Sequence, residues 1–344
     1  MNPGCRIPQP VVRFLMVLAL ILVWCILPVS AVSVTDDAGT VVTLNATPVR
    51  IVSLAPSNTE ILAALGLLDR VVGVTDVCDY PPEVKNITRI GGYSAISTEK
   101  VAAVRPDLVI ASDITPRETV NRLRELGLNV VIIAPRNIDD VLRDIRLVGT
   151  LTGKEEVAGP LATNLSARLA TVGPGSLSAS RPSVAHVVWH DPLYVSGNDT
   201  LQDDVIVHAG GRNVFADRSG WGTVSLEEFL LKNPDVILVN GGGGMDASEN
   251  DVILKAFMTN PQYASLSAVK NNRVFAIDSD IISRSGPRIV DATEQVARII
   301  QTVEGQETIS PKGSSPAAGS AKTPGFTACA LIPGLLVVLI LRKK

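Results

Sequence analysis

The chain has 344 residues, a formal net charge of −3 and an aromatic content of only 4%. A charge this close to neutral, without a basic patch interleaved with aromatic residues, argues against nucleic acid as a partner. Cys5, Cys25 and Cys329 lie near the two ends of the chain and leave only Cys78 in its body, so the composition excludes a disulfide framework and a cysteine-based metal site there.

The N-terminus has the pattern of an export signal. Arg6 and Arg13 precede the uncharged apolar run Phe14–Leu27, and the small-residue site Pro28–Ala31 follows it. This order predicts a signal peptide over residues 1–31. The alternative is an uncleaved anchor, because the run is near the shortest length that spans a bilayer. Both interpretations place the body outside the cytoplasm.

In the body, apolar runs of strand length alternate with helical patterns, which indicates an α/β fold with mostly parallel sheets. An N-terminal lobe is expected over residues 34–136. Its first helix, from Asn58 to Leu65, is expected to begin at a capping box of Ser57 and Glu60 and to end at Gly66. The other elements predicted for this lobe are strands 49–54, 71–75, 107–111 and 130–134 and helices 98–104 and 118–126.

The linking segment, residues 137–173, carries apolar residues at helical spacing without a strand signal. We expect one long helix here, with Gly159-Pro160 as the point of any kink or break. Such a helix would hold two lobes at a nearly fixed separation.

A C-terminal lobe, residues 181–303, repeats the alternation, and Gly210-Gly211 is expected to stop one of its helices. The elements predicted for this lobe are strands 183–189, 236–239 and 274–277 and helices 201–208, 225–231 and 292–303.

The C-terminus predicts a surface tether. Residues 304–323 are rich in Gly, Ser, Pro and Ala, which is typical of a flexible stalk. The junction Pro324-Gly325-Phe326, an apolar segment and a basic end follow, and together they resemble the archaeal PGF-CTERM sorting signal. The resemblance implies that residues 324–344 are cut and replaced by a lipid, and the alternative is a plain transmembrane helix. Glycosylation sequons, typical of a surface protein, begin at Asn45, Asn86, Asn164 and Asn198.

The segments Ser97–Ile110 and Ser225–Leu238 form an internal repeat, with Ser, Glu, Pro and Asp at the same offsets. Each serine is expected to cap a helix and to place Glu99 or Glu227 in its first turn. Alternatively, the similarity of the two segments only reflects a sequence pattern that is common to αβ units in general. The repeat indicates two lobes related by a pseudo-two-fold, with a ligand at the carboxyl ends of the strands.

Seven motifs occur in order along the body: Pro56–Ile61, Asp79–Pro82, Arg89–Tyr93, Pro106–Ile110, Tyr194–Gly197, Gly210–Phe215 and Ser285–Ile289. Together they resemble the helical-backbone substrate-binding proteins of ABC importers for cobalamin, haem and iron–siderophores, and most of all the cobalamin-binding branch. The resemblance implies the class III periplasmic-binding-protein fold, in which a long backbone helix joins two Rossmann-like lobes. It also implies a monomer that delivers a metal chelate to a permease dimer and its ATPase.

The family resemblance assigns two kinds of site. Glu99 and Glu227 match the carboxylates that dock onto permease arginines, and the alternative is that they only stabilise helix dipoles. Tyr93 and Trp221 match aromatic positions in the cobalamin cleft. At two further positions that are aromatic in such relatives, this chain has Val77 and Ser112. Another corrinoid, haem or a ferric chelate therefore stays open as the ligand.

Five more residues are predicted to contact ligand. Trp189 and His190 lie at a strand end expected to face the cleft; core packing is the alternative for Trp189. His190 is a candidate axial metal ligand or hydrogen-bond donor. Arg288 is the candidate contact for an anionic ligand. Ser57 ends the turn after the first strand, and Asn58 begins the helix that follows.

No enzyme motif is present. His186, His190 and His208 lack metal-ligand spacing, and Gly241–Gly244 lacks the Lys-Ser/Thr of a phosphate-binding loop, so we interpret it as a loop at the cleft mouth. We expect no catalytic activity, no cofactor and no resident metal. The alternatives are a surface ligand sensor without a transporter and a surface enzyme.

Overall fold

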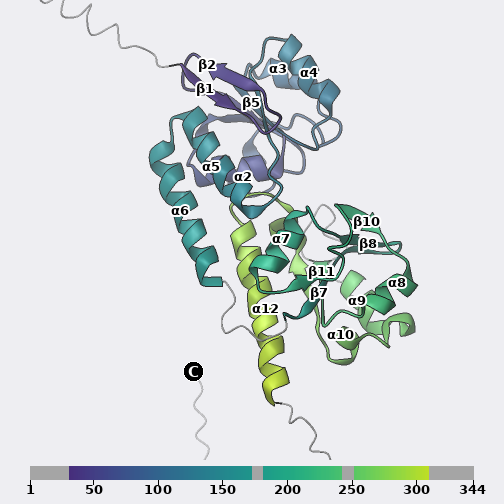
Figure 1. Cartoon of the computed structure of the whole chain (residues 1–344). Helices are drawn as coiled ribbons and strands as arrows, with labels where there is room; N and C mark the ends of the chain where they lie inside the picture. The colour runs from purple at the N-terminus through teal and green to yellow at the C-terminus, as the bar shows by residue number, and fades with distance from the viewer. Residues whose placement is uncertain (1–30, 173–180, 242–251, 310–344) are drawn as a thin grey trace, which may run out of the picture.

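The computed structural model describes residues 31–172, 181–241 and 252–309. Two α/β lobes lie one above the other in Figure 1, and two long helices run along one side of the molecule. The predicted signal peptide and C-terminal sorting segment fall outside the described ranges, as do residues 242–244 of the predicted glycine loop. No helix within the described ranges is long and apolar enough to cross a bilayer.

The N-terminal lobe is built on a four-stranded parallel sheet. Its strand order is β4 (Val71–Val74), β3 (Ile51–Ser53), β5 (Leu108–Ser112) and β6 (Val130–Ile133). Every residue of β3 and β5 is buried, as expected for parallel strands covered on both faces.

Helices cover both faces of this sheet. The first, α2 (Pro56–Ala64), packs on one face, while α3 (Thr98–Ala103) and α4 (Arg117–Glu125) pack on the other. Short 3₁₀ turns lie at Leu68–Arg70 and Pro82–Asn86. The backbone amide of Gly66, at a φ of 68°, bonds to the Ala63 carbonyl just after α2, as expected for a C-terminal cap.

The predicted capping box at the start of α2 is wrong. The helix begins two residues earlier than predicted, after Ala55, with Pro56 in its first turn and no side-chain cap. Ser57 lies inside the helix, and the Glu60 carboxylate is bound by arginines of the other lobe rather than by the backbone.

A two-stranded antiparallel hairpin that the sequence did not predict precedes the first sheet. It pairs β1 (Val32–Thr35) with β2 (Val41–Leu44). Its turn is held against the lobe because Asp36 accepts the backbone N–H of Ile132 and Asp37 pairs with Arg143.

The linking segment is a helical hairpin and not the single helix predicted. It consists of α5 (Ile138–Thr152) and α6 (Glu155–Val172). The break lies at Gly153, which adopts the left-handed conformation with a φ of 65° that glycine favours. Pro160 lies inside α6 without ending it. Only α6 therefore runs from the N-terminal lobe to the C-terminal lobe, where it contacts the last helix.

The C-terminal lobe has a mixed sheet. Its strands β7 (Ser183–His190), β11 (Val236–Gly241) and β12 (Val274–Asp278) are parallel, while β8 (Leu193–Ser196) and β10 (Trp221–Thr223) add an antiparallel edge. The short β9 (Arg212–Asn213) pairs with β7. The surrounding helices are α7 (Leu201–His208), α8 (Leu226–Lys232), α9 (Val252–Thr259), α10 (Ser267–Lys270), α11 (Ser279–Ser283) and α12 (Ile289–Ile309), with a 3₁₀ turn at Pro261–Tyr263.

The described lobes share an apolar core. One buried cluster continues from the first sheet through α5 and α6 to α7 and α12. A second cluster, with Phe215, Phe229 and Phe257 at its centre, lies on the opposite face of the second sheet. Because α12 continues to Ile309, the first six residues of the predicted stalk are helical.

The internal repeat is present in the structure. Ser97 accepts a hydrogen bond from the backbone N–H of Lys100, and Ser225 accepts the same bond from Glu228. Both serines therefore cap their helices as predicted.

The aspartate of each repeat holds the first strand of its lobe. Asp107 accepts the backbone N–H groups of Val49 and Arg50, just before β3. Asp235 accepts the backbone N–H and the hydroxyl of Ser183, the first residue of β7. The two lobes thus use one local device at equivalent places.

Two glycines of the linking hairpin provide a stability test. A Cβ built on Gly149 overlaps the Cβ of Ala158, whereas a Cβ on Gly159 meets nothing within 4 Å. We expect Gly149→Ala to lower the free energy of unfolding by about 1–3 kcal/mol through overpacking. The matched control Gly159→Ala should raise it by up to about 1 kcal/mol, because alanine is the better helix former. Urea denaturation measures both, and equal effects would contradict the close approach of α5 and α6.

Candidate functional site

A cavity of about 790 Å³ lies between the two lobes. Its volume is within the range of roughly 300–1,000 Å³ that is usual for small-molecule sites. The wall of the N-terminal lobe comes from residues that follow β3, β4, β5 and β6. That of the C-terminal lobe comes from β7, β10, β11 and from residues at and near α7 and α11. The cavity therefore lies where the carboxyl ends of parallel strands from both lobes meet.

Three of the predicted ligand-binding residues line this cavity: Ser57, Tyr93 and Trp221. Tyr93 belongs to the N-terminal lobe and Trp221 to the C-terminal lobe, and both rings are exposed. The indole N–H of Trp221 donates to Oε1 of Gln202 at 3.2 Å, which fixes the ring at the cavity wall. Val77 and Ser112 line the same cavity.

Trp189 and His190 do not line the cavity, contrary to the prediction. Residue Val188 of β7 lines it instead, and alternation along a strand turns Trp189 to the opposite face. There Trp189 packs against the core around Phe229, and its indole N–H donates to the Asp191 carbonyl at 2.8 Å. The alternative of core packing therefore describes Trp189 better.

Asn58 is also absent from the cavity wall, because its side chain is buried. Its amide donates to the carbonyls of Ile110 and Ala111 at 3.3 and 3.0 Å. It therefore ties the start of α2 to the end of β5, and so supports the part of the wall that carries Ser57 and Ser112.

Arg288 is held by the N-terminal lobe rather than presented to a ligand. Its guanidinium donates to both Glu60 oxygens, at 3.0 and 2.6 Å, and lies 4.0 Å from the centre of the Tyr80 ring. Glu60 is only 3% exposed. A Cβ on Gly286 would lie 3.0 Å from the same carboxylate, so the turn before α12 closes tightly over it.

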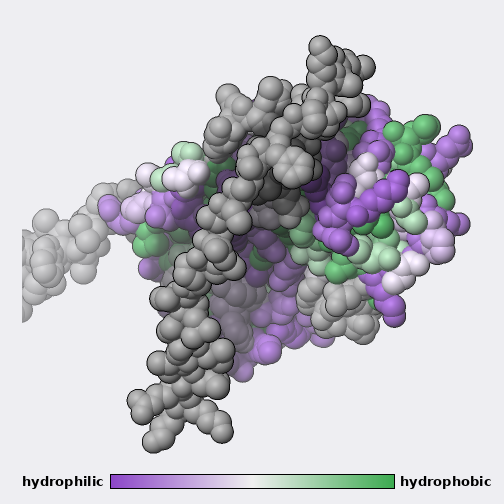
Figure 2. Space-filling model, turned by 90° about the horizontal axis from the view of Figure 1, so that it is seen from below, coloured by the Kyte–Doolittle hydropathy of each residue, from purple (hydrophilic) through white to green (hydrophobic). Residues whose placement is uncertain are grey.

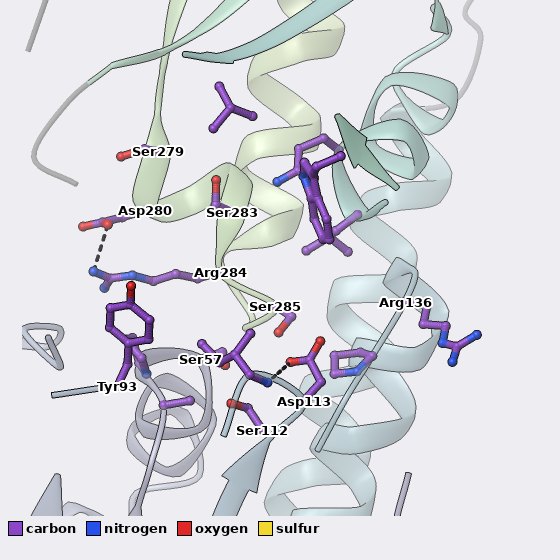
Figure 3. A pocket seen from close by; sticks show the side chains of 18 of the residues that line it. Ser57, Tyr93, Ser112, Asp113, Arg136, Ser279, Asp280, Ser283, Arg284 and Ser285 are labelled. Atoms are coloured by element: carbon purple, nitrogen blue, oxygen red, sulfur yellow. Dashed lines mark hydrogen bonds and ion pairs between the residues drawn. The ribbon is translucent and has the colours of Figure 1, made fainter. Parts of the chain in front are cut away.

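Arg284, which sequence reasoning missed, lines the cavity instead. It pairs with Asp280 at 2.8 Å and Asp79 at 2.7 Å, and contacts Glu60 at 3.3 Å. Figure 3 shows the Asp280 pair at the cavity wall above Tyr93. The spacing of Arg284 and Arg288, four residues apart around a Ser-Gly-Pro turn, was the available sequence signal. Glu60, Arg284 and Arg288 are called the inter-lobe clamp below.

The electrostatics of the clamp favour the charged form of its two arginines, since, against the effect of burial, neighbouring carboxylates raise the pKa of Arg284 and of Arg288. Burial opposes the charge of Arg284, but its bond to Asp79 and the neighbouring carboxylates raise the pKa of the guanidinium. Burial also opposes the charge of Asp79, yet the hydrogen bond and charge of Arg284 lower the pKa of Asp79. For Asp280, burial outweighs the arginine and raises the pKa.

Within the described ranges, no group of three His, Cys, Asp or Glu side chains is placed to hold a metal ion. His186 lies behind the wall, bonded to Ser196 at 3.1 Å and to the lining residue Asn240 at 3.0 Å. Burial lowers the pKa of His186 to about 4, so the ring is neutral at physiological pH.

The family model described as "Periplasmic binding protein" matches residues 51–281. The chain belongs to this family. The lipoprotein YvrC of Bacillus subtilis, described as an uncharacterized ABC transporter substrate-binding protein, is 32% identical over 277 residues, which cover 78% of this chain and 85% of YvrC. The vitamin B12-binding protein of Vibrio cholerae O395 is 30% identical over 260 residues, covering 75% of this chain and 91% of the relative.

Solved structures confirm the predicted class III periplasmic-binding-protein fold. The vitamin B12-binding protein BtuF of Vibrio cholerae matches with a TM-score of 0.66 and 29% identity, over 75% of this chain and 98% of BtuF. The apo form of the haem-binding protein RhuT from Roseiflexus sp. RS-1 matches with a TM-score of 0.66 and 29% identity, over 74% of this chain and 98% of RhuT. The same fold thus occurs in relatives named for different ligands.

In this periplasmic binding protein, Glu99 and Glu227 are exposed at equivalent places of the two lobes. Each lies in the first turn of its helix, α3 or α8, and these helices lie on the side of the molecule opposite α6. Backbone and Ser97 hydrogen bonds lower the pKa of Glu99. Figure 2 shows the molecule from below, where hydrophilic and hydrophobic residues are mixed over the coloured surface.

The inter-lobe clamp gives a second stability test. Glu60→Gln leaves the poorly exposed guanidinium of Arg288 without its charge partner and removes one of the three carboxylates around Arg284, and breaking a buried pair in this way costs about 3–5 kcal/mol. We expect a corresponding loss in the free energy of unfolding. Glu125→Gln, which removes an exposed pair with Arg122, is the control and should cost less than about 1 kcal/mol. Urea denaturation of both variants decides, and similar losses would show that the clamp contributes no more than a surface pair.

Proposed function

We propose that the protein is the extracellular substrate-binding component of an ABC importer and captures a corrinoid, cobalamin being favoured, between its lobes. The observation that carries the proposal is the cavity of about 790 Å³ with an exposed aromatic ring from each lobe, Tyr93 and Trp221. Relatives named as vitamin B12-binding proteins, 28–30% identical over nearly their full length, support it.

Aromatic rings suit such a ligand. A flat, partly apolar macrocycle gains from dispersion contacts with ring faces and loses little hydrogen bonding there. Trp221 is already fixed by Gln202, which reduces the conformational entropy lost on binding. Serines and an asparagine also line the wall and can bond the amide groups at the rim of a corrin ring; they are Ser57, Ser112, Ser219, Asn240, Ser279, Ser283 and Ser285.

Haem or a ferric siderophore is the alternative ligand on the same architecture. Relatives of both kinds support it, namely RhuT and a hydroxamate-transport protein of Saccharomonospora viridis. Val77 and Ser112 at the wall also fit either ligand, because they replace the aromatic residues expected at these positions in cobalamin-binding relatives. An axial role for His190 is not part of the proposal, because His190 lies off the cavity.

Delivery to the transporter is proposed through Glu99 and Glu227. The two carboxylates are exposed on one side of the molecule and come from the same position of the internal repeat. A pseudo-symmetric pair suits a dimeric permease that presents the same cationic surface twice, and charge of this kind sets docking register and rate.

The proposed location is the outer face of the cytoplasmic membrane. Residues 1–31 direct export, and residues 324–344 anchor the chain through a lipid or a helix. Three of the four sequons begin at exposed asparagines, whereas the Asn198 amide donates to the Ala216 carbonyl and is half-buried. Glycosylation is therefore proposed for Asn45, Asn86 and Asn164 alone. A sensor or an enzyme at this surface remains the remote alternative.

Ligand capture is tested with the two cavity aromatics. Trp221→Ala and Tyr93→Ala should each raise the Kd for cyanocobalamin about tenfold, since ring contacts beyond buried area contribute about 0.5–1.5 kcal/mol. Trp189→Phe, off the cavity, should leave the Kd within about twofold. Isothermal titration calorimetry measures all three. If cyanocobalamin, cobinamide, haem and ferric chelates all leave the melting temperature of the wild type unchanged at excess ligand, chelate capture is refuted.

Docking is tested by charge reversal. Glu99→Lys with Glu227→Lys should abolish uptake of labelled ligand while the Kd of the purified protein stays unchanged. Glu155→Lys with Glu156→Lys makes the same change of net charge at exposed first-turn glutamates of α6, and should preserve uptake. Normal uptake by the first pair would sink the docking role.

A further inference from the structure

We infer that the cavity discriminates by charge and favours a corrinoid that carries a net positive charge over one that carries an added phosphate. This inference rests on the proposed capture of a corrinoid and specifies which members of that class bind best. It depends on three features of the wall: a neutralised arginine, two unneutralised carboxylates and the acidic residues at the helix starts.

The arginine at the wall is not available to an anion. Arg284 is held by Asp280, Asp79 and Glu60 at 2.8, 2.7 and 3.3 Å, and its side chain is only 11% exposed. An anionic ligand group would have to displace a carboxylate from it and leave that carboxylate without a counter-charge, which is costly in a partly buried place. Arg288 is bound in the same way by Glu60 and does not line the cavity.

Two carboxylates of the wall lack such a partner. Asp113 follows β5 in the N-terminal lobe, and Asp199 precedes α7 in the C-terminal lobe. Both are exposed; Asp113 accepts the backbone N–H of Ile114, and Asp199 accepts the Ser219 hydroxyl. Neither forms an ion pair with any other residue that the structure describes. A ligand between the lobes therefore meets negative charge from both sides.

The other cation of the wall does not offset this pair. Arg136 is exposed, and its guanidinium points away from the other labelled side chains in Figure 3. With Asp280 matched to Arg284, the charged groups that remain are two carboxylates and this one outward guanidinium.

Helix starts at the cavity would attract anions if they were bare, since each carries about half a positive charge. The start of α7 has Asp203 and Asp204 in its first turn, and Asp278 caps α11, whose first turn contains Asp280. Of the three described helices that begin at the wall, α2 alone has no acidic residue in its first turn. Carboxylates therefore offset two of the three helix starts that reach the wall.

The chemistry of corrinoids makes the inference testable. Cobalt(III) in the singly anionic corrin ring leaves positive charge on cobinamide, whereas cobinamide phosphate adds a phosphate to the same molecule. A unit charge about 8 Å from a carboxylate changes affinity by roughly two- to thirtyfold at effective dielectric constants from about 80, for water, to about 20, for a protein surface. We therefore expect (aquo)(cyano)cobinamide to bind about tenfold more tightly than its phosphate ester at low ionic strength.

The experiment is isothermal titration calorimetry of the full-length protein with both corrinoids at pH 7.5, at low salt and at about 0.5 M salt. The preference should shrink at high salt, where screening acts within a few ångströms. It should fall to about twofold or less in Asp113→Asn with Asp199→Asn. Glu155→Gln with Glu156→Gln makes the same change of net charge on α6, away from the cavity, and should retain it.

Equal affinity for the two corrinoids, or tighter binding of the phosphate, would overturn the inference while leaving corrinoid capture intact. A preference that survives in the aspartate double variant would also overturn it, because the discrimination would then lie elsewhere. Binding of neither corrinoid would overturn the proposed function, and the inference with it.

Discussion

The buried carboxylate of Glu60 is the contact on which the relation between the two lobes depends. It comes from α2 of the N-terminal lobe and accepts hydrogen bonds from Arg284 and Arg288 of the C-terminal lobe, 224 and 228 residues further along the chain. Removing three charges from water is costly unless each finds a partner with good geometry. Few relative positions of the two lobes bring these three charges together. Gly286, which has no side chain, allows the turn before α12 to approach the Glu60 carboxylate closely.

With the lobes held in this way, the cavity follows from the repeat. In each lobe an aspartate, Asp107 or Asp235, anchors the first parallel strand. A serine-capped helix precedes each aspartate in the sequence by the same number of residues. The carboxyl ends of both sheets then face one another, and the residues after those strands become the walls. Repetition of one local pattern thus produces a cavity that neither lobe forms alone.

Features with local causes were predictable from the sequence. The bounds of α7, the cap at Ser225 and the C-terminal stop at Gly66 depend on residues within a few positions, and the structure has them as predicted. Features with distant partners were not. Glu60 fits a capping box by spacing, yet its partners lie in the other lobe. The place of Trp189 at a strand end predicts a position in the cleft, but strand alternation turns its side chain to the core.

The clamp also determines what the cavity presents to a ligand. Arg284 belongs to both, so the contacts that fix the lobes use the guanidinium that an anion would otherwise bind. Asp79 is half exposed and Asp280 lies at the wall, so displacing either one exposes an unmatched charge near the ligand itself. The relative position of the lobes and the preference for ligand charge therefore depend on the same residues. A change of ligand charge in this fold would require a change in the contact between the lobes as well.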